Sequence, residues 1–129
     1  MALYRDLARG GPLPPDDVAM LHLDKVLSHQ GTMIWGAEVA GRIRAICTLH
    51  ILPNITYGGR PYALIENVVS RAEMRRMSLG RAVMNAAIAA AWDARCYKIM
   101  LLTGSAEAQG FYQALGFDPD EKNAMILRR

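Results

Sequence analysis

An alternation of residue types over residues 42–51 constrains the fold of this chain more than any other feature. The members of one series are apolar, and they are Ile43, Ala45, Cys47, Leu49 and Ile51. The residues between them are mostly polar or charged. A period of two predicts a β-strand with one face in the core. A second strand, starting near residue 32, is expected on the other side of Ala40-Gly41.

The rest of the chain predicts alternating helices and strands. The predicted elements are a helix over about 15–29, a loop over 52–61, a strand over 62–70, an alanine-rich helix over about 79–94, a short strand over 97–104, a helix between Ser105 and Gly116, and a closing strand over 124–129. Three strands in a row followed by alternation predict a mixed, mainly antiparallel central sheet with helices on both faces. We therefore expect one α/β (α+β layered) domain over residues 1–129.

Composition excludes several classes of protein. Hydrophobic residues make up 52% of the 129 residues and charged residues 21%, which is typical of globular chains. No apolar run approaches the ~20 residues that span a bilayer, and the first residues lack the long apolar stretch of a secretory signal. We therefore expect a cytoplasmic protein with no membrane partner. The scattered histidines predict no metal site, and Cys47 and Cys96 are expected to be reduced core thiols.

Net charge bears on the kind of ligand. A charge of +3 without a basic run is too mild for nucleic acid, but it suits a polyanionic small molecule. Arg75, Arg76 and Arg81 gather where the strand over 62–70 gives way to the alanine-rich helix, in the stretch EMRRMSLGRAV. A helix start offers unpaired backbone N–H groups to an anion, and Gly80 permits close approach. A bound phosphate is one interpretation of this turn, and an ordinary solvated basic helix start is the other.

Two motifs resemble one enzyme family. The stretch RRMSLGRA resembles the Arg/Gln-x-x-Gly-x-Gly/Ala motif of the GNAT superfamily of N-acetyltransferases, and SAEAQGFYQALGF is similar to its Asn-x-x-Ala-x-x-Phe-Tyr-x-x-x-Gly-Phe helix. The resemblance covers roughly residues 32 to 127. IENVVS and CYKIMLLTG further resemble the branch that contains glucosamine-6-phosphate N-acetyltransferases.

The resemblance implies direct transfer of an acetyl group from acetyl-CoA to a primary amine, without an acyl-enzyme and without a metal. It implies that backbone groups of the strand bind pantetheine and that the strand-to-helix turn binds the pyrophosphate. The implied cofactor residues are Val68, Val69, Ser70, Arg75, Arg76, Met77, Ser78, Leu79, Gly80, Arg81 and Ser105.

Three positions depart from the family pattern. Ser78 stands where the motif has its first glycine, and a positive φ there would cost a serine roughly 1–2 kcal/mol. Ser105 stands where the family often has asparagine, although its hydroxyl can cap a helix or reach the pantetheine. The family's first strand is hard to find, because ALYRDL over residues 2–7 is a poor candidate, so the N-terminal edge is expected to be trimmed.

The resemblance also suggests catalytic residues. Tyr112 matches the tyrosine of the Phe-Tyr pair, and a phenol that is protonated at neutral pH can donate to a departing thiolate. The alternative for Tyr112 is a core residue of an amphipathic helix. Glu66 lies on the strand that borders the acceptor site, where it could be a base or a carboxylate that positions the amine. Tyr57 and Arg60 could contact the acceptor from a loop, or that loop could simply be solvated.

The leading hypothesis is an acetyl-CoA-dependent N-acetyltransferase that acts on a small-molecule amine. A peptide or protein amine is the nearest alternative, and a non-catalytic acyl-CoA sensor is an alternative from another class. A homodimer is possible, because the predicted closing strand over 124–129 could pair or exchange across a two-fold axis.

Overall fold

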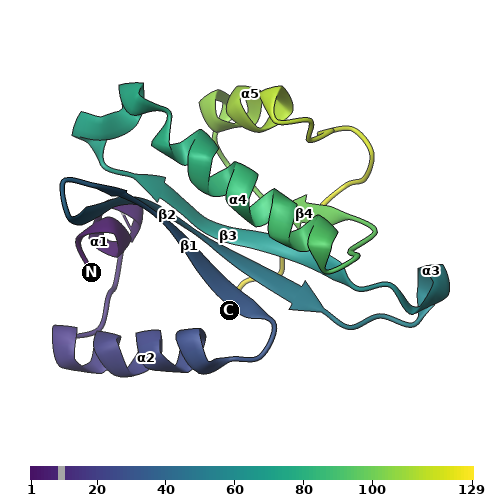
Figure 1. Cartoon of the computed structure of the whole chain (residues 1–129), viewed down its shortest axis with the longest axis horizontal. Helices are drawn as coiled ribbons and strands as arrows, with labels where there is room; N and C mark the ends of the chain where they lie inside the picture. The colour runs from purple at the N-terminus through teal and green to yellow at the C-terminus, as the bar shows by residue number, and fades with distance from the viewer. Residues whose placement is uncertain (9–10) are drawn as a thin grey trace.

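The computed structural model describes residues 1–8 and 11–129, apart from the side chains of Arg75 and Arg76, which lie outside the described part. Within it, four strands form one mixed sheet in the order β1-β2-β3-β4 (Figure 1). Their bounds are Thr32–Val39 for β1, Arg42–Leu52 for β2, Tyr62–Ser70 for β3 and Ile99–Leu101 for β4. The first three strands pair antiparallel, and β4 pairs parallel to β3.

Helices cover both faces of the sheet. The bounds are Ala2–Ala8 for α1, Asp16–Ser28 for α2, Leu79–Asp93 for α4 and Ala106–Ala114 for α5, with the short turns α3 (Thr56–Gly59) and η1 (Ala72–Met77). Helix α4 packs on β1, β2 and β3, while α1 contacts β3 and α2 contacts β1 (Figure 1). The mixed sheet with helices on both faces confirms the predicted fold class.

The core lies between α4 and one face of the sheet. Ala45, Cys47 and Leu49 of β2 meet an inner stripe of α4 that contains Ala87 and Ala91, and all five side chains are fully buried. Alanine on this stripe keeps the helix close to the strands, and the rest of α4 is held by ordinary helix propensity. This packing fixes the first turn of α4 relative to the end of β3.

The predicted one-sided burial of β2 is only partly correct. Ile46 and Thr48 are buried together with Ala45, Cys47 and Leu49 of the alternating series, because α1 and α2 cover the face that the alternation assigned to solvent. Ile43 belongs to the apolar series but is 49% exposed, since it lies near the turn that joins β1 to β2. A central strand between two helical layers is buried on both faces, so alternation between polar and apolar residues no longer separates a buried face from an exposed one.

The two ends of the chain differ from expectation in different ways. Residues 2–8 form the helix α1, which buries Leu3 against the sheet, although the weak pattern of this stretch predicted no helix; in the described residues no strand precedes β1, in agreement with the poor candidacy of ALYRDL for a first strand. Residues 124–129 do not form the predicted closing strand, and Met125 and Leu127 are 95% and 100% exposed. A strand requires a partner edge, and β4 offers a paired stretch of only three residues. The predicted strand over 97–104 is correspondingly shorter.

Candidate functional site

A β-bulge interrupts β3 in the middle of the sheet. Ile46 of β2 lies opposite Val69 and Thr48 lies opposite Glu66, so β3 carries one more residue than β2 between these two pairs. Asn67 lies within this step and has a φ of +54°, a conformation that asparagine tolerates better than most residues. A bulge leaves the extra residue outside the ladder and redirects the neighbouring groups. The backbone around Asn67 and Val68 is therefore available for other partners.

The sheet opens beside this bulge. Strand β4 pairs with β3 through residues 63–65 and 99–101, and in the described part of the chain the pairing ends there, one residue before Glu66. Leu102, Thr103 and Gly104, which continue from β4, are exposed. Ligands of α/β proteins commonly bind where the carboxyl ends of parallel strands separate. The bulge and the opening thus form one candidate site.

The turn that follows β3 ends in a left-handed residue. After η1, Ser78 has φ +56° and ψ +27°, and α4 begins at the next residue. The expected positive φ at this position is confirmed, so the serine bears the cost of a left-handed conformation. Ser78 makes no side-chain cap hydrogen bond to α4. The first N–H groups of α4, which have no intrahelical acceptor, are therefore not satisfied by this cap.

The other residues predicted for this turn fall in different environments. Gly80 faces α5, where an added Cβ would lie 3.6 Å from the ring of Phe111. Leu79 packs against the core, whereas Met77 and Arg81 are exposed at the surface. The backbone of Arg75 and Arg76 belongs to η1, and their side chains lie outside the described part. The first residues of α4 thus lie beside Phe111, in the second half of α5.

Tyr112 lies on α5, half-buried between two aromatic rings. Its ring meets Phe111 at a centroid distance of 5.2 Å and Phe117 at 6.1 Å, both edge to face. Burial raises the pKa of the Tyr112 phenol, and the nearby Cys47 and Glu66 raise that pKa further. The effect of Glu66 indicates that this carboxyl group and the phenol share one region of the molecule. A raised pKa keeps the hydroxyl protonated at neutral pH, as a proton donor requires.

Ser105 was predicted on the cofactor side and Cys47 in the core. Ser105 caps α5, where its Oγ accepts a hydrogen bond from the backbone N–H of Ala108 at 3.3 Å. Its predicted capping role is confirmed, and contact with pantetheine stays a prediction. Cys47 donates from its Sγ to the Val83 carbonyl at 3.4 Å, and burial raises the pKa of this thiol to about 11. Cys47 is thus a core thiol, as the sequence predicted.

The predicted acceptor contacts lie at the other end of β3. Tyr57 stacks on Tyr97 with ring centroids 4.1 Å apart, and Arg60 donates to the carbonyls of Arg95 and Cys96 at 3.2 Å each. Between Tyr62 and Asn67 the strand rises by roughly 16 Å at about 3.3 Å per residue. A single chain therefore does not bring Tyr57 and Arg60 to the bulge.

Sequence comparison shows the family. Residues 2–117 match the Acetyltransferase (GNAT) family. The chain belongs to this family. The GNAT match includes the bulge of β3, the turn into α4 and the helix that carries Tyr112. The sequence signal for the bulge was weak, since an asparagine in the middle of the strand is its only sign.

Individual relatives agree with the family assignment. The chain is 35% identical over 102 residues to the glucosamine 6-phosphate N-acetyltransferase of Trypanosoma brucei brucei. The aligned stretch covers 79% of this chain and 63% of that relative, so the chain spans less than two thirds of the relative's length. A solved structure of a protein from Agrobacterium tumefaciens str. C58 is 36% identical, with a TM-score of 0.91, covering 98% of this chain and 90% of that one. AAC(6')-Iy in complex with the bisubstrate analog CoA-S-monomethyl-acetylneamine shares the fold, with a TM-score of 0.77 and 18% identity over 99% of this chain and 90% of that one.

No helix in residues 1–8 and 11–129 is both long and apolar enough to cross a membrane.

Proposed function

We propose that the chain is an acetyl-CoA-dependent N-acetyltransferase that transfers the acetyl group directly from the thioester to a primary amine of a small molecule. The observation that carries this proposal is the bulge at Asn67, which lies beside the opening between β3 and β4. Membership of the GNAT family and the trypanosomal relative support the reaction class.

The described residues fit a CoA thioester. The cofactor brings an activated acetyl group and a thiol leaving group. Backbone groups of Val68, Val69 and Ser70 would bind its pantetheine arm, since β3 is not paired with β4 at this level. The first N–H groups of α4, at Leu79, Gly80 and Arg81, would bind the pyrophosphate, because their helix leaves them without an internal acceptor.

Two side chains would act on the reacting groups. The Tyr112 hydroxyl, which is protonated at neutral pH and whose pKa is raised further by burial, would donate to the departing thiolate. The Glu66 carboxylate, which is exposed on β3 next to the bulge, would accept a proton from the amine or hold the ammonium in place. No acyl-enzyme is required, because the amine itself attacks the thioester carbonyl.

Calorimetric titration with acetyl-CoA tests the cofactor part of this proposal. We expect the wild-type chain to bind with a micromolar Kd, and Arg76→Ala to weaken binding roughly 10- to 100-fold, as expected for the loss of one charge-assisted bond to phosphate. Arg42→Ala, an exposed arginine at the start of β2, is the matched control and should bind like the wild type. Titration with 3′-dephospho-CoA separates the pyrophosphate contacts from those to the 3′-phosphate.

Absence of binding at millimolar acetyl-CoA would contradict the cofactor assignment. Binding without turnover on any amine would favour the alternative of an acyl-CoA sensor. Turnover on peptide N-termini but not on amino sugars would favour the alternative of a peptide or protein amine. The trypanosomal relative makes phosphorylated amino sugars the first acceptors to assay.

We also propose that the chain forms a homodimer in the cytoplasm. The two cysteines of the described chain are free and buried, which suits a reducing compartment. Met125, Ile126 and Leu127 are exposed apolar residues near the end of the chain, and Met100 and Leu102 are exposed along the β4 edge. Pairing of these segments between two copies would bury the apolar residues of 125–127 and those along the β4 edge.

Light scattering tests the homodimer. It should give twice the chain mass of 14.2 kDa for the wild type, and Leu127→Lys should lower the measured mass to that of one chain; a monomeric wild type would refute the dimer.

A further inference from the structure

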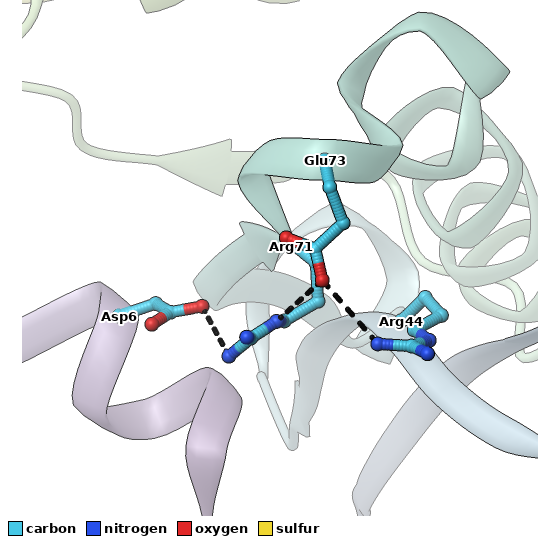
Figure 2. A network of polar contacts seen from close by, with 4 residues as sticks. All are labelled: Asp6, Arg44, Arg71 and Glu73. Carbon is cyan, nitrogen blue, oxygen red and sulfur yellow. Dashed lines mark hydrogen bonds and ion pairs between the residues drawn. The ribbon is translucent and has the colours of Figure 1, made fainter.

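Four charged side chains form a network beside the turn that leads into α4. Figure 2 shows Asp6 of α1, Arg44 of β2, Arg71 directly after β3, and Glu73 of η1. Arg71 donates from Nη1 to Asp6 Oδ2 at 2.9 Å and from Nε to Glu73 Oε1 at 3.2 Å. Arg44 donates from Nη1 to the same oxygen of Glu73 at 3.3 Å. Helix α1, strand β2 and η1 thus meet at one cluster.

Backbone hydrogen bonds place Arg71 at the root of the turn. Its N–H donates to the Arg44 carbonyl at 2.8 Å, and its own carbonyl accepts from the N–H of Met74 at 2.9 Å. The chain then runs through η1 to Ser78, whose left-handed conformation starts α4. Arg71 and Glu73 therefore lie at the base of the short segment that leads to the first N–H groups of α4.

Glu73 joins the two arginines through one oxygen atom. Its own backbone N–H lowers the pKa of the Glu73 carboxyl, and Arg71 and Arg44 lower that pKa further. The depressed pKa means that the carboxylate, and with it the network, persists at neutral pH and is lost only as the pH falls through the acidic range. The network is also electrically balanced, because two arginines face one aspartate and one glutamate.

We propose that this network is a positioning device for the cofactor phosphates, in which Glu73 holds η1 against β2 so that the start of α4 is set before the cofactor binds. This inference rests on the proposed use of acetyl-CoA. The side chains are between 22% and 49% exposed, and exposed ion pairs contribute little to the free energy of unfolding. Loss of the network should therefore change the geometry of the turn more than the free energy of unfolding.

The test compares CoA binding by the wild type, Glu73→Gln and Asp16→Asn. Gln keeps the shape of Glu73 but removes its charge, so we expect the Kd for CoA to rise about fivefold, the sum of two weak charged contacts. In the same variant, amide hydrogens of residues 72–81 should exchange faster without any cofactor, while kcat at saturating acetyl-CoA stays unchanged. Asp16→Asn breaks the exposed ion pair between Arg5 of α1 and the first residue of α2, which shares no side chain with the four-residue network, and should alter none of these quantities.

The outcomes separate this inference from the proposed function. If the wild type binds CoA and Glu73→Gln binds it equally well with unchanged amide exchange, the positioning role is overturned and the acetyltransferase proposal stands. A loss of unfolding temperature as large as the loss of affinity would make Glu73 an ordinary stabilising residue and would also overturn it. A wild type that binds no CoA overturns both proposals. Replacement of Arg44 by glutamine should produce a smaller effect in the same direction as Glu73→Gln, because it removes one of the two arginine contacts of Glu73 and leaves the contact with Arg71.

Discussion

Replacing Tyr112 with phenylalanine should lower kcat by roughly 10²- to 10⁴-fold, the usual contribution of a positioned general acid. The reason is that we propose the half-buried phenol as the proton donor to the departing thiolate, and its pKa is raised by burial, then by Cys47 and Glu66. Phenylalanine keeps the edge-to-face contacts with Phe111 and Phe117, so the free energy of unfolding should change little. Steady-state kinetics and calorimetry on the same preparation measure kcat and the Kd for CoA.

The pH dependence gives a second check on this role. The donor is the neutral phenol, and its pKa lies above the ordinary value of 10.0, so loss of the acid should not limit the wild type below that pH. Tyr62→Phe removes a hydroxyl from the opposite end of β3 and is the matched control, with kcat expected to be unchanged. A Tyr112→Phe variant that keeps kcat within threefold would show that Tyr112 is a packing residue of α5.

The parts of the fold that the sequence predicted share one property, which is that local pattern and burial agree. Strand β3 over 62–70 and helix α4 from residue 79 have the predicted starts, because breakers precede the strand and an alanine-rich run continues the helix. The Ser105 cap and the left-handed Gly116 beyond α5 were equally local signals. Local sequence was enough to predict an element wherever its formation did not depend on contacts with a distant segment of the chain.

The failures all depend on distant segments. Helix α1 is short and its sequence is weakly patterned, and it is held by Leu3 against the sheet and by the Asp6–Arg71 contact. The segment over 124–129 has strand-forming residues but no partner strand in the described chain. The local sequence pattern does not indicate whether a distant segment is available to pack against α1 or to pair with residues 124–129.

The candidate site shows the same division. The family motifs placed the turn before α4 and Tyr112 correctly on their elements, since each motif is a continuous stretch of sequence. The bulge was missed because it is a register difference between β2 and β3, which only pairing reveals. Tyr57 and Arg60 were assigned to the acceptor because the resemblance implies that their loop walls the acceptor pocket. They contact Tyr97 and the carbonyls of Arg95 and Cys96 at the other end of β3 from the bulge, and their contact with an acceptor stays a prediction.

The second large effect is expected at the bulge, where Asn67→Val should slow acetyl transfer by about 10²-fold and lower the free energy of unfolding by about 1–2 kcal/mol. A β-branched residue resists φ +54°, so the strand would straighten or shift its register. The Val68 N–H, which we propose polarises the thioester carbonyl, would then turn away from it. Asn67→Gly is the matched variant, because glycine adopts positive φ freely and also removes the amide side chain. We expect Asn67→Gly to keep kcat near the wild-type value, measured by the same assay alongside thermal unfolding.

If Asn67→Gly lost as much activity as Asn67→Val, the side-chain amide rather than the backbone of the bulge would be the functional group. If both variants kept full activity, the bulge would have no part in catalysis, and the polarising donor would have to lie elsewhere along the opening between β3 and β4.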